Sequence, residues 1–212
     1  DTALKLERVT GVPARLWNNL EASFREQLAR IESRQHLDEQ EEWLKQIPTR
    51  ELINRGAIKP VNDTTELIEE TFRFFGVASV RAWQRGWNKP QFAFRKSPSA
   101  AGHDGALAAW LRLAELKAHR SECGPYDATR FRAAVRSVRE LTVTTPDVFV
   151  PEMQRLCLDA GVAFVLEPEI KKAKVSGAAK WLTPTKPMIA MNLLGKSNDK
   201  FWFTFFHEAG HV

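Results

Sequence analysis

The sequence is poor in cysteine and has no long apolar run, and each absence excludes a class of protein. Only Cys123 and Cys157 occur among 212 residues, and they form no Cys-x-x-Cys pair. Two cysteines are too few for a disulfide framework, so we expect a reducing, cytoplasmic compartment. No apolar run is long enough to span a membrane, and the start, Asp1–Lys5, does not resemble a signal peptide. We therefore expect no membrane partner.

Two further absences concern the chain ends and the basic residues. The first residue is not methionine, and we expect a piece cut from a longer protein at both ends. The net charge is +5, yet the arginines are scattered rather than gathered in blocks. Such a charge permits contact with nucleic acid, but a solvated basic surface is the simpler interpretation. With 43% hydrophobic residues, the chain can form one or two folded domains.

The stretch 200–212, KFWFTFFHEAGHV, joins five aromatic residues to a His-Glu-x-x-His pattern. On a helix, His207 and His211 are four residues apart and share one face, where two imidazoles can bind one ion. Neutral imidazole suits Zn²⁺, which activates a bound water for hydrolysis. Glu208 is placed to take the proton from that water. The pattern predicts Zn²⁺ held by His207 and His211, with Glu208 as the catalytic base.

The alternative is an aromatic core helix that carries two histidines by chance. We expect so apolar a helix to be buried, and buried imidazoles and carboxylates need partners, which favours a metal. A catalytic zinc site has three protein ligands, and only Val212 follows the second histidine. We therefore expect this piece to bind zinc weakly and to be inactive as an enzyme.

The spacing of apolar residues predicts an α+β fold. Strands are expected at 162–166, 175–182 and 188–193, the last two forming a hairpin around a turn at 183–187. A loop is expected over 88–104. The histidine helix should pack against this small sheet. Other helices are expected at 2–9, 14–44, 48–55, 63–75, 79–87, 105–120, 127–141 and from Pro151 to about 160.

The first residues resemble a known DNA-binding domain. Leu6–Glu21 (LERVTGVPARLWNNLE) is similar to the last two helices of an Xre-type helix-turn-helix domain of HigA-like antitoxin regulators. The resemblance implies that residues 1–47 hold the remnant of this domain and a long connecting helix. DNA would then be bound by a recognition helix that precedes Asp1, while the remaining helices could form a homodimer. An unrelated helical hairpin is the alternative.

Residues 125–212 resemble the ImmA/IrrE metallopeptidase family, and residues 48–124 would be a helical connector. The family resemblance implies a gluzincin-like zinc fold, His207 and His211 as ligands, Glu208 as base, and an acidic third ligand downstream. It also implies a protein substrate, because known members cut helix-turn-helix repressors. The words that carry the resemblance are Val175–Leu182 (VSGAAKWL), Ile189–Asn192 (IAMN) and Phe201–His211 (FWFTFFHEAGH), supported by Phe74–Val77.

Together these features predict a transcription regulator whose zinc endopeptidase domain hydrolyses a repressor. The alternative is a non-catalytic regulator or antitoxin in which the peptidase-like domain serves sensing or protein interaction. Under the first hypothesis, a substrate strand could add to the edge of the sheet near residues 176–181.

Overall fold

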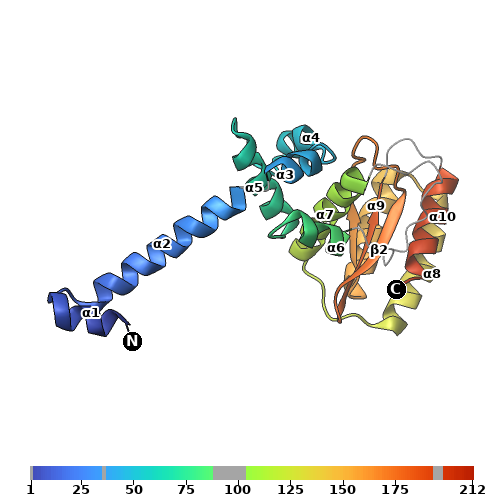
Figure 1. Ribbon diagram of the computed structural model, residues 1–212. Helices are drawn as coiled ribbons and strands as arrows, with labels where there is room; N and C mark the ends of the chain where they lie inside the picture. The colour runs from blue at the N-terminus through green and yellow to red at the C-terminus, as the bar shows by residue number, and fades with distance from the viewer. Residues whose placement is uncertain (1, 35–36, 88–103, 193–197) are drawn as a thin grey trace. The chain divides into compact units, whose positions relative to one another are not determined.

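A computed structural model describes residues 2–34, 37–87, 104–192 and 198–212, and the structural statements below concern these residues (Figure 1). The chain divides into two compact units, Asp1–Glu42 and Trp43–Val212. Each unit is described by itself. In the described part of the chain, no helix is long and apolar enough to cross a membrane.

The first unit consists mainly of a helical hairpin. Helix α1 (Thr2–Thr10) packs on α2 (Ala14–Arg34), and the turn between them contains Gly11, whose φ of +73° is a conformation that glycine adopts without strain. Helix α3 (Leu37–Leu44) follows. The single helix expected over 14–44 is thus described as α2 and α3, with residues 35–36 outside the described part. Among the described side chains of α1 and α2, only Ala3 is buried.

The second unit begins with four helices, and one of them is capped at both ends. The Asp63 side chain accepts a hydrogen bond from the backbone N–H of Glu66 at 3.0 Å, and Gly76 ends the same helix with φ +68°. The loop expected over 88–104 falls almost entirely outside the described residues. The helices are α4 (Thr49–Asn54), α5 (Thr64–Phe75), α6 (Val80–Trp87) and α7 (Asp104–Arg120).

A three-stranded sheet forms the middle of the second unit. Strand β3 (Lys186–Met191) is central, with β1 (Ala163–Leu166) parallel to it on one side and β2 (Gly177–Thr183) antiparallel on the other. The predicted hairpin is therefore confirmed as β2 and β3. Pro187, expected in the turn, lies in β3 opposite Trp181, because the turn is shorter than the prolines suggested.

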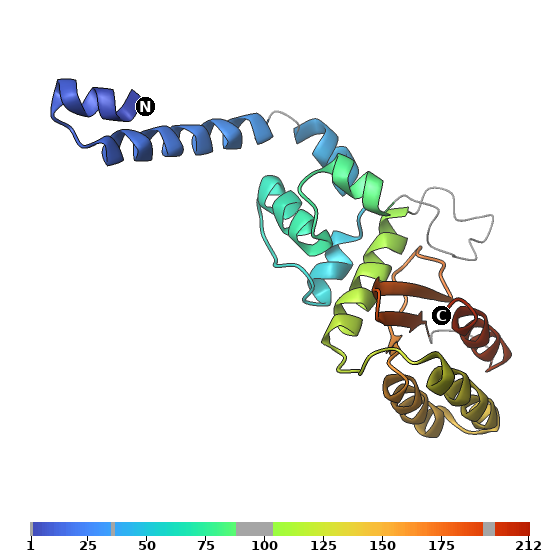
Figure 2. The same cartoon turned by 90° about the horizontal axis from the view of Figure 1, so that it is seen from below.

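Helices cover both faces of the sheet, so the second unit has three layers (Figure 2). Ala163 and Val165 face the cluster built around α7, whereas Val162 and Phe164 face the opposite cluster. This alternation is the two-residue period of a strand. The opposite layer contains α8 (Ala128–Glu140), a short 3-10 helix (Leu141–Val143), α9 (Pro146–Asp159) and α10 (Asn198–Ala209). The predicted α+β fold is confirmed.

Two features differ from the sequence-based expectation. Helix α9 begins at Pro146, and Pro151, expected at its start, lies inside it. Pro146 occupies the first turn, where the missing N–H costs nothing. In addition, buried residues at 43–83 and 106–118 share one hydrophobic core with the sheet, and they include Trp110, which is fully buried. The segment expected as a connector therefore forms the layer that covers one face of the sheet.

Candidate metal and hydrolytic site

His207 and Glu208 lie in the last turn of α10, which packs directly on β2 and β3, and His211 lies in the turn that follows this helix. Gly177 allows this close approach. A Cβ atom there would lie 2.7 Å from Thr204 Cγ2 and 3.0 Å from Met191 Sδ, both too short for non-bonded atoms. Phe205 also anchors the helix, because its ring is fully buried and meets Phe164 edge-on. The sheet therefore determines where α10 places its polar residues.

His207 and His211 approach each other as the helical spacing predicts. Their Nε2 atoms are 3.4 Å apart and their ring centroids 4.9 Å. Two imidazole nitrogens bound to one tetrahedral zinc at ~2.05 Å are necessarily about 3.3 Å apart. The same separation is at the long end for a hydrogen bond between two rings. The two nitrogens therefore fit a shared ion.

The expectation that both histidines are buried is wrong. His207 and His211 are exposed, and so is Phe203, which stacks on His207. The aromatic residues of α10 cover only the part of its surface that faces the sheet and α9, so the opposite side of this helix is exposed to solvent. The histidines consequently need no metal to compensate for burial, and the convergence of their Nε2 atoms is the observation that remains.

Glu208, in contrast, is only 2% exposed, and its Oε2 atom has no hydrogen-bond partner among the described residues. Burial raises the pKa of the Glu208 carboxyl, while the charges on His207 and His211 and a hydrogen bond from the backbone N–H of Ala179 oppose this rise. A carboxylate with an elevated pKa is suited to accept and then return a proton near neutral pH.

Ala179 can reach Glu208 because β2 is an edge strand of the described sheet. The backbone N–H of Asn192 donates to the carbonyl of Ser176, so these two residues form a hydrogen-bonded pair at the start of the ladder between β2 and β3. In an antiparallel ladder such pairs alternate, so the N–H groups of Gly177, Ala179 and Trp181 point away from β3. The sequence did not predict the contact of Ala179 with Glu208, because this contact uses the backbone N–H and the alanine side chain has no polar group.

A third ligand is not found in the described part of the chain. No group of three His, Cys, Asp or Glu side chains that could hold a metal ion occurs there. The described residues therefore supply two donors and a buried carboxylate.

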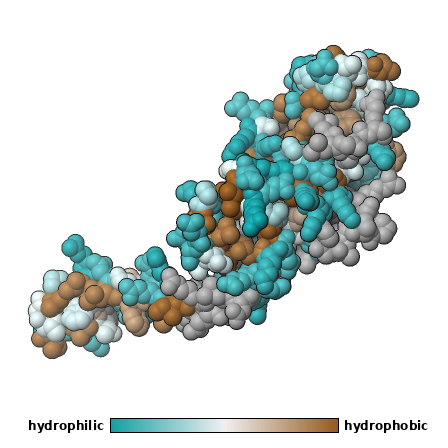
Figure 3. Space-filling view, turned by 90° about the horizontal axis from the view of Figure 1, so that it is seen from above, coloured by the Kyte–Doolittle hydropathy of each residue, from teal (hydrophilic) through white to brown (hydrophobic). Residues whose placement is uncertain are grey.

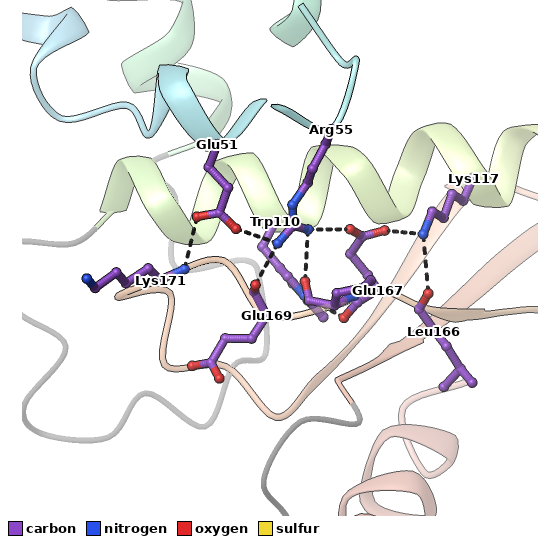
Figure 4. A network of polar contacts seen from close by, with 9 residues as sticks. Glu51, Arg55, Trp110, Lys117, Leu166, Glu167, Glu169 and Lys171 are labelled. Atoms are coloured by element: carbon purple, nitrogen blue, oxygen red, sulfur yellow. Dashed lines mark hydrogen bonds and ion pairs between the residues drawn. The ribbon is translucent and has the colours of Figure 1, made fainter. Parts of the chain in front are cut away.

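Ion pairs tie the sheet to the layer that contains α7, on the face opposite α10. Glu167, after β1, is 2.8 Å from both Arg55, which follows α4, and Lys117 of α7 (Figure 4). On β2, Lys180 pairs with the buried Glu115 of α7, next to Ala179. Spacing along the sequence did not predict these pairs, because the partners lie far apart in the chain: 65 residues separate Lys180 from Glu115, and 112 separate Arg55 from Glu167.

Comparisons of the sequence with family models and with curated proteins, and of the structure with solved structures, found no match. The family resemblances consequently rest on the sequence words quoted above, and the activity is a proposal.

Proposed function

We propose that the chain belongs to a transcription regulator whose C-terminal part is a zinc-dependent endopeptidase that cuts a helix-turn-helix repressor or a similar protein. The observation that carries this proposal is the 3.4 Å separation of His207 Nε2 and His211 Nε2, which matches two ligands of one tetrahedral ion. The buried carboxyl of Glu208 adds a proton acceptor beside that pair. The free thiols of Cys123 and Cys157 agree with a reducing cytoplasm.

Each residue has a distinct role in this proposal. His207, in the last turn of α10, and His211, in the turn after it, donate two nitrogen ligands, and the remaining ligand comes from outside the described residues. Zinc, when bound, polarises the substrate carbonyl and lowers the pKa of a water. Glu208 would accept a proton from the attacking water and pass it to the leaving amine. Burial raises the pKa of Glu208, which favours uptake of that proton.

The substrate would bind as an extended strand along β2. The outward N–H groups of Gly177 and Trp181 provide the hydrogen bonds of an added strand, with the Glu208 contact at Ala179 between them. Replacing Trp181 by proline removes one of these donors and leaves the ladder to β3 in place. We expect slower cleavage with unchanged zinc content in the full-length protein. Unchanged cleavage would eliminate this mode of substrate binding.

The test of the function uses the full-length protein purified with its metal. Zinc content is measured by elemental analysis, and cleavage of candidate helix-turn-helix repressors is followed by mass spectrometry. We expect about one zinc per chain, lost in His211→Ala, and cleavage abolished in Glu208→Gln although that variant keeps its zinc. A full-length protein that binds no zinc would refute the proposal.

A second candidate is a non-catalytic regulator or antitoxin whose peptidase-like part senses a metal or a partner. It is favoured by the lack of a three-ligand cluster in the described residues. The two candidates differ at Glu208. A sensor should keep metal binding and DNA binding in Glu208→Gln, and its wild-type form should cleave nothing, whereas the peptidase loses a measurable activity.

A further inference from the structure

Tyr126 connects the edge strand β2 to the residue that follows the histidine pair. Its ring meets Trp181 edge-on, with the ring centroids 5.1 Å apart, and its hydroxyl donates a hydrogen bond to the backbone carbonyl of Val212 at 3.0 Å. Hydrophobic residues reach the surface of the second unit between hydrophilic ones, as the face drawn in Figure 3 shows, and Trp181 is 40% exposed. Tyr126 itself is half-buried and is the only tyrosine of the chain.

The turn that contains His211 is bonded differently from the helix before it. Helix α10 ends at Ala209. Gly210 shares its N–H between carbonyls three and four residues earlier, whereas His211 and Val212 donate only to carbonyls three residues earlier, at 3.1 and 3.4 Å. Such 3-10 bonds have poorer geometry than α-helical bonds, and helix ends fray. The position of the second histidine therefore depends on what else holds this turn.

The backbone around Tyr126 is fixed by its neighbours. Its N–H donates to the carbonyl of Thr185, in the turn between β2 and β3, at 3.2 Å. Gly161 lies so close to the same loop that a Cβ atom there would be 2.6 Å from the Tyr126 Cα atom. The next residue, Asp127, caps α8 by accepting from the N–H of Arg130 at 2.8 Å. The phenol group therefore projects from a loop that is tied to the sheet and to α8.

The ring and the hydroxyl of Tyr126 have separate contacts. The ring packs against Trp181 and against Phe131, which belongs to the core cluster shared by the sheet and α10. The hydroxyl binds Val212, and within the described residues it is the one side-chain group that forms a hydrogen bond with the backbone of residues 210–212. A phenylalanine would keep the packing and lose only the bond to the turn.

We propose that Tyr126 is a positioning residue whose hydroxyl holds the turn after α10, so that His211 stays at the separation from His207 that suits one metal ion. This inference rests on the zinc site of the proposed function. Tyr126 acts through the backbone of Val212 and is not itself a ligand. Since its ring packs on Trp181, the same residue also connects the turn to the edge along which the substrate is proposed to bind.

The test uses the full-length protein, in which the Val212 oxygen belongs to a peptide bond, with Co²⁺ alone as the probe. The visible absorption of bound Co²⁺ gives its affinity and reports the coordination geometry. Tyr126→Phe should raise the Co²⁺ dissociation constant about three- to tenfold, the effect of one lost hydrogen bond. It should also lower the absorption per bound ion, because the site departs from tetrahedral geometry.

Thr204→Val is the matched control, because it removes a hydroxyl from α10 itself. That hydroxyl donates to the carbonyl of Lys200 at 2.7 Å, far from the turn, and valine keeps the methyl group that faces Gly177. The control should leave the Co²⁺ constant and spectrum unchanged. Thermal denaturation of both metal-free variants identifies a temperature at which each is folded. A purely structural role of Tyr126 would lower Tm and leave Co²⁺ binding by the folded protein unchanged.

The outcomes separate this inference from the proposed function. If the wild-type protein binds Co²⁺ and Tyr126→Phe binds it with the same constant and spectrum, the positioning role is overturned and the zinc site stands. Equal losses in Tyr126→Phe and Thr204→Val also overturn the positioning role, because the effect would then belong to the helix as a whole. A wild-type protein that binds neither Co²⁺ nor Zn²⁺ overturns both proposals.

Discussion

Glu208 should destabilise the metal-free fold at neutral pH, and removing its charge should stabilise it. Its carboxyl is 2% exposed, Oε2 has no partner among the described residues, and burial raises its pKa. When the pKa of a carboxyl is higher in the folded state than in the unfolded state, the group contributes most to stability at a pH where it is protonated in both states. That contribution is lost as the pH rises from the unfolded value of about 4.5 through the folded value.

We therefore expect Glu208→Gln to increase the free energy of unfolding at pH 7. A buried carboxylate oxygen without a partner costs about 1–3 kcal/mol, and a neutral amide of the same shape keeps an acceptor for the Ala179 N–H. An increase of 1 kcal/mol would raise Tm by roughly 2–4 °C in a chain of this size. Below pH 4.5 the wild-type carboxyl is neutral as well, so the difference should disappear.

Glu115→Gln is the matched control, because Glu115 is also buried but has two cationic partners, Lys180 and Arg112. Breaking these pairs should lower stability by about 2–3 kcal/mol, since the partners stay partly buried. Both variants are compared with wild type by urea denaturation with a chelator present, at pH 7 and at pH 4. A Glu208→Gln variant less stable than wild type at pH 7 would refute the account of a desolvated base.

Two further predictions concern packing and thiols. Gly177→Ala should lower the free energy of unfolding by about 1–3 kcal/mol, since the added methyl would lie 2.7 Å from Thr204. Gly86→Ala is the control, because this glycine lies in a helix with open space around it, and its replacement should be neutral or stabilising. Thermal denaturation measures both variants, and equal effects would contradict the contact of α10 with β2. Burial raises the pKa of the Cys157 thiol to about 12, so at pH 8 only Cys123 should react with a thiol reagent in the folded chain; a second fast-reacting thiol would show that the core around Cys157 opens.

Local spacing along the chain was enough to predict most of the elements. Asp63 and Asp127 cap helices because a carboxylate accepts from backbone N–H groups two or three residues ahead, and both caps are present. The approach of His207 to His211 also follows from helix geometry alone, since positions four apart lie on one face in any fold. The predicted start of α9, Pro151, was wrong because Pro146 suits a first helical turn equally well.

Exposure and partners depended on contacts between distant segments, which no local pattern encodes. The periodicity of α10 is the same whether one side or all sides are covered, so only the packed layers put Glu208 inside and both histidines outside. The contact of Glu208 with Ala179 likewise arises because β2 is an edge strand, and edge position depends on strand order. Helical spacing set the residues side by side, and the surrounding layers set their access to water.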